Sequence, residues 1–173
     1  MARSLFIKVL FIGEGGVGKT SLILRYLKRD EAKATITKGI EVFTIDRGNV
    51  KVLLWDVGGQ ERFKQLSKNR LLDKALIGVL VFDLSRPNTL NKLLEDWIND
   101  PYIKKIPLKI LVANKLDLSR MNIDDLSNGI ISEINAKKFF ITSAKNGYGV
   151  DELFNYIMSI VETIATNLAP LAQ

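Results

Sequence analysis

A glycine-rich stretch near the start of the chain has the residue types and the spacing of a phosphate-binding loop. Residues 13–20 read GEGGVGKT, follow an apolar stretch and fit the pattern G-x-x-x-x-G-K-[ST]. Glycines let the backbone curl so that its N–H groups point at phosphate oxygens, and a helix starting there adds positive charge. The stretch predicts a nucleoside triphosphate or another phosphorylated ligand, with the base left open. The predicted contacts are Glu14, Gly15, Gly16, Val17, Gly18, Lys19, Thr20 and Ser21.

Two side chains of this loop have distinct expected roles. Lys19 is predicted to reach the β- and γ-phosphates, where it would also assist catalysis, and the Thr20 hydroxyl is predicted to bind Mg²⁺. A glycine-rich turn with an exposed lysine is the plainer interpretation. The position of the motif, between an apolar strand and a helix, disfavours it.

A second candidate site follows the apolar residues 52–55. Asp56 closes this stretch, and a carboxylate there, beside a phosphate loop, can hold Mg²⁺ through water. Gly58 and Gly59 would let the backbone approach a γ-phosphate, and Gln60 can orient an attacking water. Alone, the segment could equally be a solvent-exposed strand end with a tight turn. The phosphate loop upstream favours the metal and γ-phosphate interpretation.

A third candidate site, Asn114-Lys115-Leu116-Asp117, follows the apolar residues 108–113. Guanine presents two neighbouring donors, N1–H and N2–H₂, and one carboxylate can accept both, whereas adenine offers no such pair. Residues 114–117 resemble the N-K-x-D guanine motif, and by this resemblance Asp117 is predicted to select guanine. The same resemblance implies that Asn114 ties this loop to the phosphate loop and that the stem of Lys115 lies on the face of the base.

Composition limits the chemistry that the chain can perform. Its 173 residues include no cysteine and no histidine, which excludes disulfides, a zinc cluster, a cysteine nucleophile and a histidine base. The net charge is +6, but no dense basic run occurs. We interpret the charge as a solvated basic surface and predict no specific nucleic-acid partner.

The sequence also bears on membranes. It has no apolar run of about 18 residues, so no membrane span is predicted. Ala2 stands where N-myristoylation needs glycine, and the chain has no cysteine to accept a prenyl or palmitoyl group. We therefore expect no lipid anchor, at most weak peripheral membrane contact, and a cytoplasmic location.

Apolar stretches of strand length alternate with amphipathic stretches of helix length along the whole chain. Because residues 47–49 form so short a joint, the two strands that flank it must be antiparallel. We predict a three-layer α/β fold with helices on both faces of a six-stranded, mostly parallel sheet that has one antiparallel edge strand. The predicted strands are 5–12, 40–46, 50–56, 76–82, 108–113 and 139–142, and the predicted helices are 18–28, 61–72, 88–99, 123–134 and 151–165.

Together these motifs resemble the Ras superfamily of small GTPases, which has the P-loop NTPase fold, over nearly all of the chain. Residues 55–60, WDVGGQ, look most like the Arf branch, whereas Ser143-Ala144-Lys145 resembles the S-A-K loop of Ras and Rab proteins. By this resemblance the Gly59 amide senses the γ-phosphate, Gln60 is the catalytic glutamine, and Ser143, Ala144 and Lys145 contact the base, with the Ala144 amide at the guanine O6.

The family also uses a threonine that binds Mg²⁺ and senses the γ-phosphate. Thr37 fits the family pattern T-x-G best, and Thr35 is the alternative. By resemblance the cofactors are Mg²⁺ and GTP or GDP, and the partners are an exchange factor, a GTPase-activating protein and effectors.

The resemblance implies that residues 1–173 form one domain that acts as a GTP-hydrolysing switch. Hydrolysis is expected to be slow without a partner, because residues 30–40 contain no arginine that could serve as a finger in cis. Two alternatives differ in class. One is a guanine-nucleotide-dependent interaction module with negligible catalysis, and the other is an ATP-using P-loop enzyme, which Asp117 disfavours.

Overall fold

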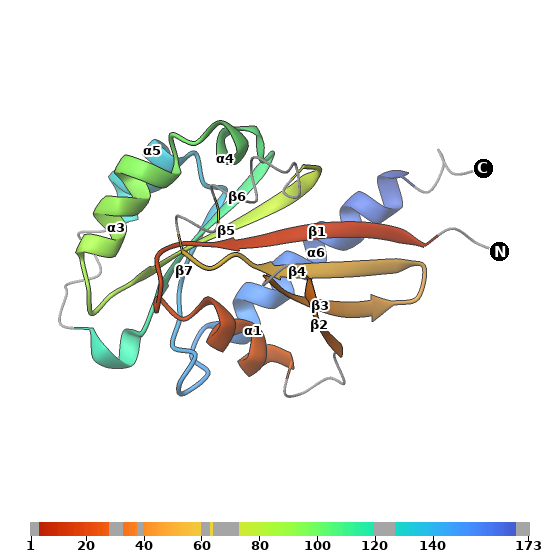
Figure 1. Ribbon diagram of the computed structural model, residues 1–173, viewed down its shortest axis with the longest axis horizontal. Helices are drawn as coiled ribbons and strands as arrows, with labels where there is room; N and C mark the ends of the chain where they lie inside the picture. Colours follow the sequence, from red (N-terminus) through yellow and green to blue (C-terminus); the bar gives the residue numbers. More distant parts are fainter. Residues whose placement is uncertain are drawn as a thin grey trace.

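A twisted, mostly parallel sheet forms the centre of the computed structural model, which describes residues 4–27, 33–37, 40–59, 63, 73–119 and 127–168 (Figure 1). The strands lie in the order β2-β3-β4-β1-β5-β6-β7. Their bounds are β1 Leu5–Ile12, β2 Lys33–Thr37, β3 Ile40–Arg47, β4 Val50–Asp56, β5 Ala75–Asp83, β6 Leu108–Asn114 and β7 Lys138–Ile141.

Among the six predicted strands, one pair of neighbours is antiparallel and the other pairs are parallel. β1 pairs in parallel with β4 and β5, and the parallel series continues through β6 to β7. β3 is antiparallel to β4, as the short joint between them predicts. All six predicted strands are present, and the α/β P-loop class is confirmed. The structure adds β2, which pairs antiparallel with β3 and extends the sheet beyond it.

The central strands are apolar because helices cover both faces of the sheet. β5 and β6 are buried almost throughout, as expected of parallel strands between two helical layers. The helices are α1 Lys19–Leu27, α3 Asn88–Lys92, α4 Pro101–Lys105, α5 Ser127–Ile134 and α6 Val150–Leu168. Two short segments supplement them, a π-helical turn at Leu93–Trp97 and a 3₁₀ turn at Leu116–Leu118.

Two separate hydrophobic cores lie on the two faces of the sheet. On one face α1 and α6 pack against β1 and β4, and Tyr26 stacks on the buried Phe154 with 4.1 Å between ring centroids. On the other face α3, α4 and α5 cover β5 and β6 (Figure 1). The buried Trp97 belongs to the core on this face. The three-layer arrangement is therefore the predicted one.

The helix boundaries follow local sequence signals, with one addition. Pro101 marks the end of the predicted helix 88–99, but it also occupies the first turn of the short helix α4, where a missing N–H costs nothing. The Asp100 side chain caps α4 by accepting the N–H of Tyr102 at 2.8 Å. Of the predicted helix 61–72, only Phe63 falls within the described residues, and its N–H donates to the Gly59 carbonyl.

Candidate functional site

The predicted phosphate loop lies where β1 ends and α1 begins. Because β1, β4 and β6 are parallel, the segments that follow them leave the sheet at the same edge. These are the segments that carry the three predicted motifs. The strand topology therefore explains how Val17 and Asn114, 97 positions apart in the sequence, come into contact.

The curl of the phosphate loop depends on glycine at two positions. Gly18 has a φ of 98°, and a Cβ there would overlap the amide nitrogen of Asn114. Gly13 has a φ of 149°, and a Cβ there would overlap the carbonyl oxygen of Val81 in β5. The two glycines that the motif pattern fixes, Gly13 and Gly18, thus follow from two close approaches to neighbouring chain segments.

Lys19 lies inside the loop. Its ammonium group donates to the carbonyls of Gly13 at 2.9 Å and Glu14 at 3.0 Å, and the residue is only 5% exposed. Burial lowers the pKa of Lys19, and the nearby carboxylates of Asp56 and Glu14 oppose that shift. A buried ammonium enclosed by the loop is well suited to an anionic ligand, which would compensate its charge.

Thr20 and Asp56 form the candidate metal site. The Thr20 hydroxyl donates to Asp56 Oδ2, so these two oxygens adjoin each other although 36 positions separate them. The other carboxylate oxygen, Asp56 Oδ1, is buried and has no hydrogen-bond partner within the described part of the chain. A hydroxyl and a carboxylate are ligands that Mg²⁺ accepts, so the residues present fit this ion.

Asn114 joins the predicted base-reading loop to the phosphate loop. The residue is 1% exposed, and its amide Nδ2 donates to the Val17 carbonyl at 2.9 Å. Its Oδ1 accepts the Thr142 hydroxyl at 3.0 Å and the Ala144 N–H at 3.2 Å. One side chain therefore holds three segments together, namely the phosphate loop, the end of β6 and the loop after β7.

Asp117 contacts the loop after β7. The Ser143 hydroxyl donates to Asp117 Oδ1 at 2.6 Å, and Lys145 Nζ lies 3.9 Å from Asp117 Oδ2. Ser143 is fully buried, and its carbonyl and amide bond Gly147 and Tyr148. The Asp117 carboxylate is therefore oriented by a rigid neighbour.

Lys115 has a partner that sequence reasoning missed. It adopts a left-handed conformation with a φ of 66°, and its Nζ lies 2.8 Å from Asp83 Oδ2. Asp83 is completely buried at the end of β5 and also accepts Arg86 Nε at 2.8 Å. Burial alone would raise the pKa of Asp83, but the hydrogen bonds to its carboxylate outweigh burial and lower it to about 2.

The side chain of Glu14 connects the phosphate loop to the helical layer. Its Oε1 accepts the indole N–H of Trp97 at 3.2 Å, and its Oε2 lies 3.3 Å from Lys92 Nζ. Trp97 belongs to the π-helical turn and meets Phe63 edge to face, with ring centroids 5.1 Å apart. Glu14 is thus a predicted nucleotide contact whose carboxylate already has protein partners.

Some predicted residues lie outside what the structure describes. Gln60 is outside the described residues, and Thr35 and Thr37 are placed only as backbone in β2. Gly59 is described, with a φ of 60°. The choice between the two threonines and the role of the glutamine therefore stay predictions.

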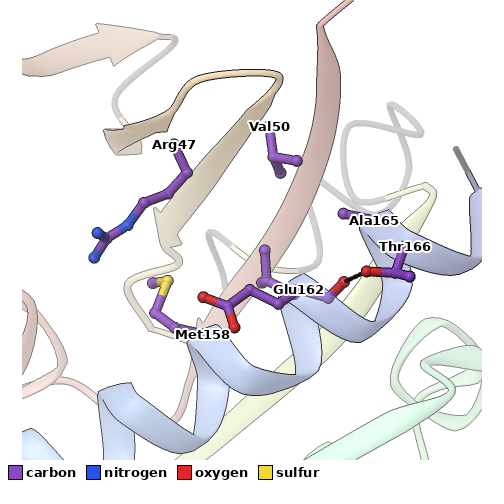
Figure 2. Close-up of a pocket in the computed structure, with 7 residues that line it drawn as sticks. Arg47, Val50, Met158, Glu162, Ala165 and Thr166 are labelled. Carbon is purple, nitrogen blue, oxygen red and sulfur yellow. Dashed lines mark hydrogen bonds between the residues drawn. The ribbon is translucent and has the colours of Figure 1, made fainter.

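A pocket of about 410 Å³ lies apart from this site, between the turn that joins β3 to β4 and the second half of α6. Figure 2 shows Arg47 and Val50 facing Glu162 and Met158 across it. Val50 starts β4, so the pocket is at the opposite end of the sheet from the phosphate loop. The pocket is lined by Arg47, Val50, Met158, Val161, Glu162, Ala165 and Thr166.

The glycine-rich loop between β1 and α1, set in this strand order, defines a P-loop NTPase of the α/β class. The chain belongs to the Ras family, whose family model matches residues 8–163. It is 34% identical over 160 residues to Ras-related protein Rab-18-B of Danio rerio, which covers 88% of this chain and 77% of that protein.

Two further relatives are similar to the same extent. Ras-related protein Rab-17 of Mus musculus is 33% identical over 158 residues, covering 87% of this chain and 73% of that protein. Ras-related protein Rab-32B of Dictyostelium discoideum is 33% identical over 177 residues, covering 94% of this chain and 67% of that protein. The resemblance to small GTPases is confirmed, and the Ras family implies guanine-nucleotide binding.

None of the helices within the described ranges is long and apolar enough to cross a membrane.

Proposed function

We propose that this protein is a GTP-binding switch that hydrolyses GTP slowly and changes its partner contacts with nucleotide state. Residues 1–173 act as one such domain in this proposal. The observation that carries it is the three-way contact of Asn114, which fixes a guanine-reading loop to a phosphate loop through Val17 and Ala144. A base site and a phosphate site held at a fixed separation suit a whole nucleotide better than a lone phosphate.

The phosphate part of the proposal uses the loop amides, Lys19 and Mg²⁺. Lys19, enclosed by the loop, would donate to the phosphates, and Thr20 and Asp56 would hold the ion, Asp56 through water. When bound, Mg²⁺ neutralises charge on the phosphates. Loss of the γ-phosphate would then release the segments that carry Thr37 and Gly59, which is how partners could distinguish the two states.

The base part of the proposal uses Asp117 as the acceptor of two guanine donors. Ser143 supports this role because its short hydrogen bond fixes one carboxylate oxygen. The Lys115 stem would lie on the base while its ammonium stays with Asp83. The Ala144 amide, now in a rather long bond to Asn114, would be shared with the guanine O6.

A nucleotide-exchange measurement tests the base assignment. We expect the purified protein, in the presence of Mg²⁺, to take up GTP and GDP in strong preference to ATP and ADP. Changing Asp117→Asn should shift preference from guanine toward xanthine nucleotides, because the amide can donate where the carboxylate accepts. Equal uptake of ATP and GTP by the unmodified protein would contradict the proposal.

A single-turnover assay tests the catalytic part. Gln60 would orient the attacking water, and an arginine supplied by a GTPase-activating protein would stabilise the transition state. We expect slow release of phosphate by the isolated protein, and slower release still from Gln60→Leu, with GDP binding unchanged. A rate above about 1 s⁻¹ without a partner would contradict this part. No release at all would favour an interaction module that only binds nucleotide.

A further inference from the structure

Arg86 is a residue outside every nucleotide-binding motif of the sequence that nevertheless contacts the phosphate loop. It lies in the turn after β5, and its Nη2 donates to the Gly15 carbonyl at 3.1 Å across 71 positions of sequence. Its Nε donates to Asp83 Oδ2 at 2.8 Å. One guanidinium therefore bridges the phosphate loop and a buried carboxylate.

The hydrogen bond to Gly15 bears on the direction of a loop amide. In a trans peptide the C=O and the following N–H point in opposite directions. A donor that holds the Gly15 carbonyl from outside the loop therefore orients the N–H of Gly16 toward the other side. Gly16, with a φ of 74°, adopts a conformation open mainly to glycine, so this peptide would otherwise rotate easily.

Three other carbonyls of the loop also accept hydrogen bonds from side chains. Lys19 holds the carbonyls of Gly13 and Glu14, and Asn114 holds that of Val17. These two donors belong to the recognised motifs. The Gly15 carbonyl is instead held by Arg86, which no motif contains.

The anchor of Arg86 is rigid. Asp83 is completely buried, and its Oδ1 accepts both the hydroxyl of Ser85 at 2.6 Å and its N–H at 2.9 Å. The same carboxylate holds Lys115, at 2.8 Å, in the guanine-reading loop. Asp83 thus anchors Arg86, which contacts the phosphate loop, and Lys115, which belongs to the guanine-reading loop.

We propose that Arg86 is a positioning residue that orients the Gly15–Gly16 peptide of the phosphate loop, and that Asp83 anchors it while also fixing Lys115. This inference rests on the proposed guanine-nucleotide binding and deepens it. Arg86 donates directly to the phosphate loop and is linked to Lys115 through Asp83, so we expect it to contribute to nucleotide retention without contributing to base choice. Asp83 contributes to both.

The test compares GDP release from Arg86→Gln and from the unmodified protein. Glutamine is shorter and uncharged and cannot bridge Asp83 and Gly15. We expect release of a fluorescent GDP to be about 10-fold faster, which corresponds to the loss of one charge-assisted hydrogen bond. Arg86 is 44% exposed, so the variant is expected to fold. Lys51→Gln is the matched control, since Lys51 forms a half-exposed ion pair with Asp46 on the β3–β4 hairpin.

A second measurement separates positioning from general loosening. Inosine diphosphate lacks the exocyclic amine that Asp117 would bind, so the ratio of GDP to IDP affinity reports on the base site. We expect Arg86→Gln to leave this ratio unchanged and Asp83→Asn to reduce it. The double variant should release GDP no faster than Asp83→Asn alone, because Arg86 acts through that anchor.

Three outcomes overturn the inference. Release from Arg86→Gln within twofold of the unmodified protein would remove the positioning role, and a changed GDP to IDP ratio would place Arg86 at the base site. Fully additive effects of the two substitutions would show that Asp83 does not act through Arg86. If the unmodified protein bound no guanine nucleotide, the proposed function would fail first, and this inference would fall with it.

Discussion

Asn114 is the side chain whose loss should most directly weaken nucleotide binding. It makes three hydrogen bonds, to the Val17 carbonyl, the Thr142 hydroxyl and the Ala144 N–H, of which the first two are buried. Changing Asn114→Ala removes all three. At about 1 kcal/mol per hydrogen bond, the expected cost is about 3 kcal/mol in the free energy that holds the two loops together.

If the nucleotide is bound only while these loops are assembled, the cost appears in its release. A change of about 3 kcal/mol corresponds to about 100-fold faster dissociation of GDP. Stopped-flow displacement of a fluorescent GDP by excess unlabelled GDP measures that rate. Changing Thr142→Val removes one of the three bonds, and we expect an intermediate increase of about 5-fold from about 1 kcal/mol.

Two other variants, Lys51→Gln and Thr142→Val, serve as references for the release rate of Asn114→Ala. Lys51→Gln, at the far end of the sheet, serves as the control and should release GDP at the unmodified rate. A rate for Asn114→Ala within a factor of three of the unmodified protein would mean that the loops stay assembled without this side chain. An effect of Thr142→Val as large as that of Asn114→Ala would instead point to loss of folding, which circular dichroism of the two variants would reveal.

Three more predictions follow from particular contacts. Gly18→Ala should abolish GDP binding measured by calorimetry, because its Cβ would overlap Asn114, whereas Gly15→Ala, with no atom near its Cβ, should still bind. Asp83 has a pKa lowered from 3.8 to about 2, so it stabilises the fold above pH 4, and about 2 kcal/mol of unfolding free energy should be lost between pH 4 and pH 2. Urea unfolding should show no such loss in Asp83→Asn. Phe154→Ala should lower the unfolding free energy by about 3–5 kcal/mol in the same assay, because the buried ring stacks on Tyr26.

The sheet was predictable because its strands are nearly continuous apolar runs. β5 and β6 are buried on both faces, so nearly all of their residues are apolar and no polar alternation interrupts them. β2 was not predicted, because residues 33–37 form a short segment whose pairing depends on β3 next to it. The helix α4 was not predicted for another reason. A proline after a helix indicates where that helix ends, but it does not indicate that a second helix begins there.

Site residues were predictable where a contact recurs as a local motif. The residues of the phosphate loop, Asn114 and Asp117 all follow apolar strands at one edge of a parallel sheet, so sequence position alone places them together. Arg86 was not predictable, because its contact with Gly15 joins distant segments and leaves no spacing pattern. Asp83 did offer a signal, since it closes an apolar strand just as Asp56 does.

The hydrogen bond between Trp97 and Glu14 places an intrinsic fluorophore in contact with the phosphate loop. The sequence contains two tryptophans, and replacing Trp55 by phenylalanine leaves Trp97 as the sole indole emitter. The N–H of that indole donates to Glu14 in the phosphate loop, and its ring forms a T-shaped contact with Phe63, four positions beyond Gly59. We expect its emission wavelength and intensity to change when either contact changes, so that loading and exchange of unlabelled nucleotide could be followed in real time.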